Sequence, residues 1–198
     1  VLVDMNSDEK AQRARIAAPQ ALQQRPGHTI EAMARALNLE PDQILGAAEG
    51  STIVSVGIEF PVVEVGDLHA LRQSSANVEQ FKRLSLNPVI TGANADADDA
   101  FLVYVYYRNG SDEVSARMFG PLHGIPEDPA TGSAAGALAG LLAQRDDING
   151  HMRYQITQGV EMGRPSRIVV DVERFNGQIS TTRISGECVE VISGTLSL

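Results

Sequence analysis

Two spacings of hydrophobic residues divide the chain into helical and extended segments. Within residues 27–39 the apolar positions recur at the spacing of one helix face, and they are Ile30, Met33, Ala34 and Leu37. Thr29 precedes them and suits a helix N-cap. We therefore expect an amphipathic helix, followed at Pro41 by one further helical turn. The opening residues 1–6 have the texture of a strand.

The pattern changes to runs of β-branched residues from residue 51 onward. Residues 52–65 predict two short strands broken near Gly57, and residues 67–73 and 78–84 predict two short helices. Further on, residues 100–107 and 113–119 flank Asn109-Gly110, a strong signal for a β-hairpin.

The second half predicts one smooth helix among many strands. The helix is expected over residues 132–144, and strands are expected over 152–158, 166–173, 178–184 and 187–192. Asn176-Gly177 and Ser185-Gly186 are read as turns, which makes the last three strands an antiparallel meander. The predicted fold class is α+β, with a sheet that curls around the helix. The regular alternation of strand and helix in a Rossmann fold is not seen.

Composition narrows the classes of protein to consider. The 198 residues are 43% hydrophobic, enough for a core, and 25 acids against 16 Lys and Arg give a net charge of -9. This acidic balance argues against nucleic acid as a partner. The single cysteine, Cys188, excludes an internal disulfide and fits a reducing compartment, so we expect a cytoplasmic protein. No apolar run reaches the length of a membrane span, and no secretory signal is seen, so no membrane partner is expected.

The segment "GIPEDPATGSAAGALAGLL" at 124–142 carries the candidate chemistry. Asp128 and Pro129 suit the N-cap and first position of a helix, and such a cap would contribute ~1 kcal/mol without any chemistry. Gly132, Gly136 and Gly140 fall one every four residues on one helix face. Since each costs ~1 kcal/mol relative to Ala, we expect them to let strands pack closely on a thin helix.

A functional interpretation of the same segment stays equally open. The backbone amides of Thr131, Gly132 and Ser133 would point out of the helix start, at its positive end, and form a seat for a carboxylate. Asp128 beside them could exchange a proton, and the hydroxyls of Thr131 and Ser133 could donate hydrogen bonds to an acid or enolate-like intermediate.

This segment closely resembles the signature of the PhzF-type family of phenazine-biosynthesis-like proteins, which have the diaminopimelate epimerase fold. Three further stretches are similar to that family: "ARMFGP", "ITQGVEMGRPSRIVVDV" and "ISGECVEVISGTLSL". The resemblance covers nearly everything from residue 51 to the end. It implies two similar lobes, each a curled, mainly antiparallel sheet around a central helix, with the active site in the cleft between them.

The resemblance also implies isomerisation by proton transfer without a cofactor or metal. In the best-characterised branch the substrate is trans-2,3-dihydro-3-hydroxyanthranilate, a small carboxylate-bearing compound. Carried onto this chain, Asp128 assists the proton relay and is catalytic together with Ser133, and Thr131, Gly132 and Ser133 hold the substrate. We expect residues 1–50 to be a remnant of the first lobe and residues 51–198 to form the second, with the last strand returning toward the first.

One departure from the family pattern limits the expected activity. The family's principal base is a glutamate in the first lobe, followed by a histidine in a Cys-Gly-His motif, and neither has a counterpart in these residues. His28 in "PGHT" is placed at a helix entry instead. The chain alone is therefore expected to be inactive, and to form a homodimer or associate with the missing lobe. A single-lobe protein that binds an anion or a partner without turnover is the alternative.

Other chemistries are less well supported by the residue types. An epimerase or racemase of the same fold would need a pair of thiols, whereas Cys188 is expected to be buried and structural. The four histidines lack the spacing of metal ligands, and the acids at 93–100 are read as a solvated loop rather than a calcium site. His123 is a candidate for lining the cleft, although a histidine in a loop is more often simply exposed to solvent. Arg164 is expected to stabilise the turn in which it lies rather than to bind a substrate carboxylate.

Overall fold

The computed structural model describes residues 3–8, 11–46, 50–86 and 101–188. The strands are β1 (Val3–Asp8), β2 (Ala11–Ala17), β3 (Gln23–Pro26), β4 (Ile44–Leu45), β5 (Thr52–Ser55), β6 (Glu59–Val65), β7 (Val103–Arg108), β8 (Glu113–Gly120), β9 (Ile125–Asp128), β10 (Gly150–Gln158), β11 (Ser166–Phe175) and β12 (Gln178–Cys188). The helices are α1 (Ile30–Leu37), α2 (Leu68–Gln73), α3 (Val78–Ser85) and α4 (Gly132–Arg145), with 3-10 turns η1 (Pro41–Gln43) and η2 (Pro121–His123).

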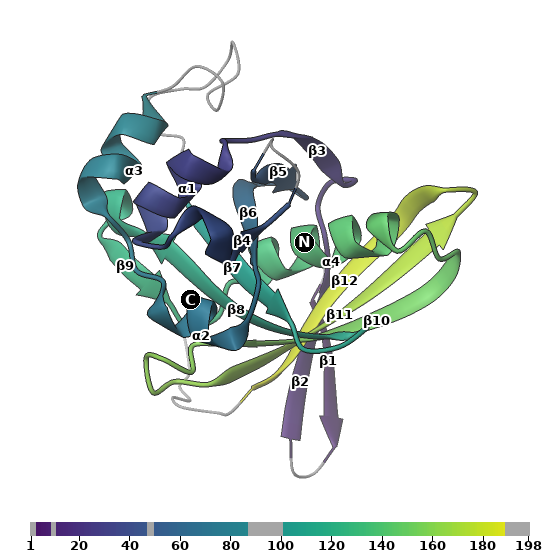
Figure 1. Cartoon of the computed structure of the whole chain (residues 1–198). Coiled ribbons are helices and arrows are strands. Elements are labelled where there is room, and N and C mark those ends of the chain that lie inside the picture. The colour runs from purple at the N-terminus through teal and green to yellow at the C-terminus, as the bar shows by residue number, and fades with distance from the viewer. Residues whose placement is uncertain (1–2, 9–10, 47–49, 87–100, 189–198) are drawn as a thin grey trace.

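The strands form one curled sheet with the order β1-β2-β12-β11-β10-β8-β7-β6-β5-β3, and β4 and β9 pair at its side with β6 and β8. Most neighbours are antiparallel, whereas β6 with β7 and β8 with β10 are parallel. Figure 1 shows the sheet wrapping beneath α4, with the β1–β2 hairpin projecting from it. The α+β class, the mainly antiparallel sheet and the central helix are confirmed.

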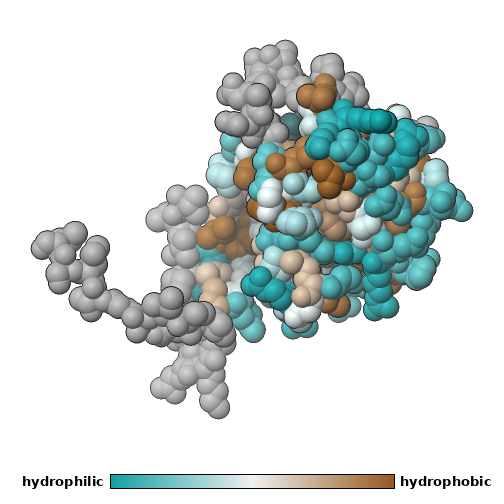
Figure 2. Space-filling view, turned by 90° about the vertical axis from the view of Figure 1, so that its left-hand side faces the viewer, coloured by the Kyte–Doolittle hydropathy of each residue, from teal (hydrophilic) through white to brown (hydrophobic). Residues whose placement is uncertain are grey.

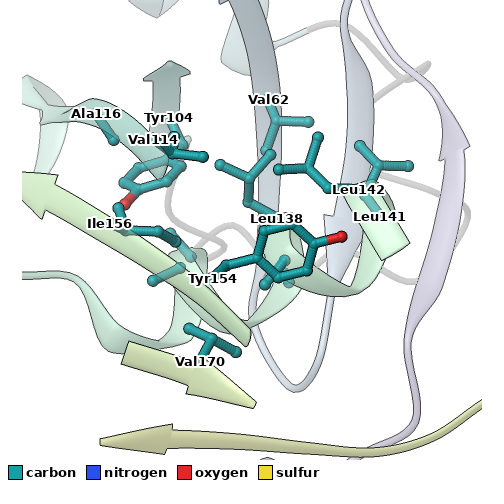
Figure 3. Packing of buried hydrophobic residues seen from close by; sticks show 14 of the residues in the cluster. Val62, Tyr104, Val114, Ala116, Leu138, Leu141, Leu142, Tyr154, Ile156 and Val170 are labelled. Carbon is teal, nitrogen blue, oxygen red and sulfur yellow. The ribbon is translucent and has the colours of Figure 1, made fainter. Parts of the chain in front are cut away.

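Helix α4 is the centre of the main core. Ten of its 14 residues are buried, from Ala134 to Ala143. Figure 3 shows Leu138, Leu141 and Leu142 of α4 among side chains from the surrounding strands, including Val62, Tyr154 and Val170. A helix that is apolar on all sides is stable only when other elements enclose it. The curled sheet provides this enclosure.

The glycines of α4 make the enclosure tight. A Cβ atom at Gly136 would lie 3.0 Å from Ile184 Cδ1, and one at Gly140 would lie 3.2 Å from Leu22 Cδ1. These separations are shorter than ordinary carbon contacts of 3.5–4.0 Å. The expected close packing of a strand is confirmed at Gly136, against β12, and Gly140 lies nearly as close to the segment between β2 and β3. A Cβ atom at Gly132 would make only an ordinary contact, 3.5 Å from Ile184.

A second core lies on the other face of β6 and β7. Side chains alternate between the two faces of a strand, so Val62 and Tyr104 face α4, whereas Val63 and Val105 face helices α1, α2 and α3. The helices contribute buried side chains that include Met33, Leu37, Leu71 and Phe81. Residues before and after position 50 therefore share this core, and the boundary between two lobes at that position stays a prediction.

The helices and hairpins follow the sequence pattern closely. Thr29 caps α1 by accepting a hydrogen bond from the amide of Ala32, and β7 and β8 form the hairpin around Asn109-Gly110. Strands β2, β3, β4 and β9 were not predicted; the turn expected from Pro41 ends at Gln43, and Ile44 and Leu45 pair with β6 instead. The predicted turn at Ser185-Gly186 is wrong, because both residues lie inside β12 and are paired on both sides, with Val169 and Ile168 of β11 and with β2.

Two of the sequence predictions concern residues that the structure does not describe. The acids at 93–100, and residues 189–192 of the predicted last strand, lie outside the described residues. Among the residues that the structure does describe, no helix has the length and apolar character of a membrane span. The face drawn in Figure 2 is mainly hydrophilic, with apolar residues in small groups between polar ones.

Candidate active site

Asp128 ends a short strand that leads into α4. Gly124 adopts a left-handed conformation (φ 71°) before β9, and Asp128 pairs with Met118 of β8. Asp128 was predicted to be the N-cap of the helix, and this is wrong: Thr131 occupies that position, and α4 begins at Gly132. The reason is that sheet pairing holds Asp128 in β9, so Pro129 and Ala130 separate it from the helix.

The Asp128 carboxylate lies beside the helix start even though it does not cap it. The hydroxyl of Thr131 donates a hydrogen bond to Asp128 Oδ2 over 2.6 Å. This is a short, charge-assisted contact between residues three positions apart. The structure thus brings Asp128 and Thr131 together, as the sequence motif suggested.

Gln158 is the centre of this arrangement, and sequence reasoning did not single it out. Its side chain is fully buried at the end of β10. Its Nε2 donates to the Asp128 carbonyl oxygen (2.7 Å) and to Thr131 Oγ1 (2.9 Å). Its Oε1 accepts from the Thr131 amide (3.1 Å) and from the Tyr104 hydroxyl (3.0 Å). Both donors and the acceptor oxygen of the side-chain amide are therefore satisfied within the protein.

Tyr104 closes the far end of this network. It is fully buried in β7, and burial, together with the negative charge of Asp128, raises the pKa of its phenol well above its ordinary value. Tyr104 therefore stays protonated and serves as a hydrogen-bond donor.

The backbone amides at the start of α4 divide into two kinds. The Thr131 amide donates to Gln158 and is not free, contrary to the expectation that all three amides are open. Gly132 and Ser133 are the first two residues of the helix, so their amides have no intrahelical acceptor. Both residues are half-buried, and the Ser133 hydroxyl has no hydrogen-bond partner in the described part of the chain. These groups can receive an anion at the positive end of the helix.

A buried ion pair fixes β9 from its other side. Glu127 and Asp128 are adjacent in the strand, so their side chains leave it in opposite directions. Arg117 Nε and Nη2 each donate to the Glu127 carboxylate over 2.8 Å. The Arg117 side chain is 9% exposed, and that of Glu127 is 14% exposed. This paired geometry holds Asp128 close to α4.

Other residues named from the sequence lie outside this network. His28 is buried against Phe101, and burial with the nearby charge of Arg25 lowers its pKa to about 4. His123 is exposed, and the amide and carbonyl of Arg164 hydrogen-bond within their turn. Cys188 was expected to be buried but is exposed at the end of β12.

Metal ligands are not gathered anywhere in the described ranges. No three His, Cys, Asp or Glu side chains among those residues are grouped so that they could hold an ion.

The chain is similar to known proteins in both sequence and fold. A family model described as phenazine biosynthesis-like protein, PhzC-PhzF, matches residues 2–194. The chain belongs to this family. Among curated proteins, an uncharacterized isomerase of Mesorhizobium japonicum is 33% identical over 171 residues, which are 84% of this chain and 54% of that protein. A trans-2,3-dihydro-3-hydroxyanthranilate isomerase of Pseudomonas chlororaphis is 43% identical over 83 residues, 42% of this chain and 30% of the relative.

Solved structures support the PhzF fold. A PhzF-family phenazine biosynthesis protein of Bacillus anthracis aligns with a TM-score of 0.73 at 18% identity, covering 95% of this chain and 64% of the other. A protein of Pseudomonas aeruginosa titled a predicted epimerase aligns with a TM-score of 0.64 at 20% identity, covering 96% and 63%. The chain thus covers 54% of the length of the Mesorhizobium relative, and 64% and 63% of the lengths of the two solved structures. The curved sheet around α4 is the fold of the PhzF family.

Proposed function

We propose that this chain supplies one side of a proton-transfer isomerase site, with Asp128 as a proton-exchanging group. One observation carries the proposal: the Asp128 carboxylate lies beside the first residues of α4, whose backbone amides have no intrahelical acceptor. A 2.6 Å hydrogen bond from the Thr131 hydroxyl holds the carboxylate there. The chain belongs to the PhzC-PhzF family, and its curated relatives from Mesorhizobium japonicum and Pseudomonas chlororaphis are both named isomerases, which supports the same reaction class.

The substrate class follows from the groups that surround Asp128. The amides of Gly132 and Ser133 favour a carboxylate, because they offer unpaired donors at the positive end of a helix dipole. The Ser133 hydroxyl can donate to the same anion or to an enolate-like oxygen. A small amino or carboxylic acid such as trans-2,3-dihydro-3-hydroxyanthranilate has this chemistry, and one relative bears the name of an isomerase of that compound.

The proposed step moves one proton and needs no cofactor. A C–H bond of the substrate breaks, its electron pair stays on the substrate as an enolate-like species, and the proton passes to a base. A proton returned to a different carbon completes the isomerisation. General acid–base catalysis by a positioned side chain contributes about 10²- to 10⁴-fold to such a reaction. The family resemblance assigns the principal base to a glutamate of the other lobe, with Asp128 assisting.

Solvent exchange tests this proposal directly. The natural polypeptide that contains these residues is incubated with candidate amino acids in D₂O, and deuterium incorporation is followed by NMR. Exchange that disappears in Asp128→Asn supports an isomerase. If no candidate exchanges, anthranilate is titrated into the ¹⁵N-labelled chain: shifts confined to the Gly132 and Ser133 amides support an anion-binding protein without turnover.

A further inference from the structure

The hydrogen bonds of Gln158 have only one consistent direction. A backbone N–H can only donate and a backbone carbonyl can only accept, so the contacts with the Thr131 amide and the Asp128 carbonyl fix which end of the Gln158 amide is oxygen and which is nitrogen. Amide orientation is otherwise ambiguous in protein structures. Nε2 therefore faces Thr131 Oγ1 and donates to it.

This direction determines what the Thr131 hydroxyl does. Because Oγ1 accepts a hydrogen bond from Gln158, its own hydrogen is left to donate to Asp128 Oδ2. Oδ2 is then occupied by a short hydrogen bond. The other carboxylate oxygen, Oδ1, has no hydrogen-bond partner among the described residues. Asp128 is only partly buried, so Oδ1 is free to contact a substrate.

We propose that Gln158 is a positioning residue, which acts through the Thr131 hydroxyl to fix the Asp128 carboxylate so that Oδ1 alone exchanges the proton. The inference rests on the proposed function of Asp128 and assigns Thr131 a different role from substrate contact. In the transfer that Asp128 assists, the bond between the proton and its donor breaks, its electron pair stays with the donor, and an O–H bond forms at Oδ1, while Oδ2 keeps its bond from Thr131. When Oδ1 gives the proton back, that O–H bond breaks.

Burial explains why such a device would be rigid. Gln158 is 0% exposed, so no water can replace a hydrogen bond that its side chain loses, and each lost partner is strongly unfavourable. The Tyr104 hydroxyl supports the same side chain from β7. Elements far apart in sequence, β7, β10 and the start of α4, therefore hold one carboxylate in a single orientation.

Thr131 provides the variants that separate positioning from structure. Thr131→Val keeps the shape of the side chain but removes the hydroxyl, and we expect kcat to fall about 100-fold with little change in KM, as for a misplaced catalytic group. Thr131→Ser keeps the hydroxyl and recovers most of the lost rate. The proposal is overturned if Thr131→Val retains kcat while folded, or if Ser is as slow as Val.

Tyr104 provides a milder perturbation with a matched control. Tyr104→Phe removes only the remote support of Gln158, and we expect a severalfold lower kcat. Tyr106→Phe is the control, because Tyr106 is also a buried tyrosine of β7 but hydrogen-bonds Glu64 and Arg145 instead. Equal losses of kcat in the two variants would contradict a specific path through Gln158.

A readout without turnover distinguishes this proposal from the proposed function. In the ¹⁵N,¹³C-labelled chain, three-bond couplings report the χ1 rotamers of Asp128. A single rotamer in the unaltered protein that becomes averaged in Thr131→Val supports positioning even if no candidate substrate reacts. One unchanged rotamer in both proteins refutes it even if the enzyme is active.

Discussion

Arg117→Met tests whether the buried ion pair behind Asp128 stabilises this part of the fold. Arg117 makes a two-pronged contact with Glu127, with both distances 2.8 Å, and a third carboxylate oxygen, Glu161 Oε2, lies 3.8 Å from its Nε. Its Nη1 also donates to three carbonyl oxygens at the end of α2, those of Leu71, Arg72 and Ser74. Methionine replaces the unbranched stem of the arginine side chain but none of these hydrogen bonds.

The expected loss follows from the burial of the partners. Removing one member of a buried ion pair costs about 3–5 kcal/mol, because the other charge is left without compensation. The Glu127 and Glu161 side chains are only 14% and 18% exposed, so both carboxylates would then lie close together in a poorly solvated place. With a typical total stability of about 5–15 kcal/mol, the variant should remain folded but with a large part of its stability lost.

Urea unfolding of a double-mutant cycle measures this effect. Glu127→Gln removes the uncompensated charge, so Arg117→Met/Glu127→Gln should recover about 1–3 kcal/mol relative to the sum of the two single losses. Lys82→Met is the control, since its pair with Glu79 is exposed and should contribute little to stability. A loss below about 1 kcal/mol for Arg117→Met, or strictly additive losses in the cycle, would refute this account of the pair.

Two further predictions concern the core and the pH dependence. Gly136→Ala places a methyl group 3.0 Å from Ile184 Cδ1, so an overpacking cost of about 1–3 kcal/mol should outweigh the ~1 kcal/mol gained in helix propensity. Urea unfolding should show a net loss of up to about 2 kcal/mol, and a variant more stable than the original protein would contradict it. The pKa of His28 is about 4 in the folded protein and about 6.5 in the unfolded chain, so the unfolded chain takes up a proton first as the pH falls. The free energy of unfolding is therefore highest above pH 6.5 and decreases by up to about 3 kcal/mol as the pH falls to 4. His28→Gln should remove that part of the slope, and identical stability profiles between pH 7 and 4 would show the reasoning to be wrong.

The sequence predicts the elements that depend on local pattern. The small and apolar residues of α4, the Thr29 cap of α1 and the Asn109-Gly110 hairpin act over a few positions, so their structural effect is visible in the letters. Asp128 and Pro129 are residue types typical of a helix start, but Asp128 pairs with β8 as part of β9, and this pairing outweighs its local preference for a helix cap. Tertiary pairing of this kind is not encoded in short-range spacing.

Gln158 shows where a further signal was available. In β10 the residues Tyr154, Ile156 and Gln158 occupy alternate positions and are all buried, so Gln158 is a polar residue at a core-facing position of a strand. A buried amide needs hydrogen-bond partners, which makes such a position a candidate for a structured network. Which residues complete the network depends on contacts between β7, β10 and α4, and only the fold supplies those.

Asp128→Asn tests the central claim most directly. Asparagine can still accept the Thr131 hydrogen bond but cannot carry the proton, so stability should fall by no more than about 1 kcal/mol. We expect kcat for solvent-proton exchange, measured on the natural polypeptide with an exchanging amino acid, to fall about 10²- to 10⁴-fold. A variant that exchanges protons at the original rate, or one whose lost activity is fully explained by lost stability, would contradict a proton-transfer role for Asp128.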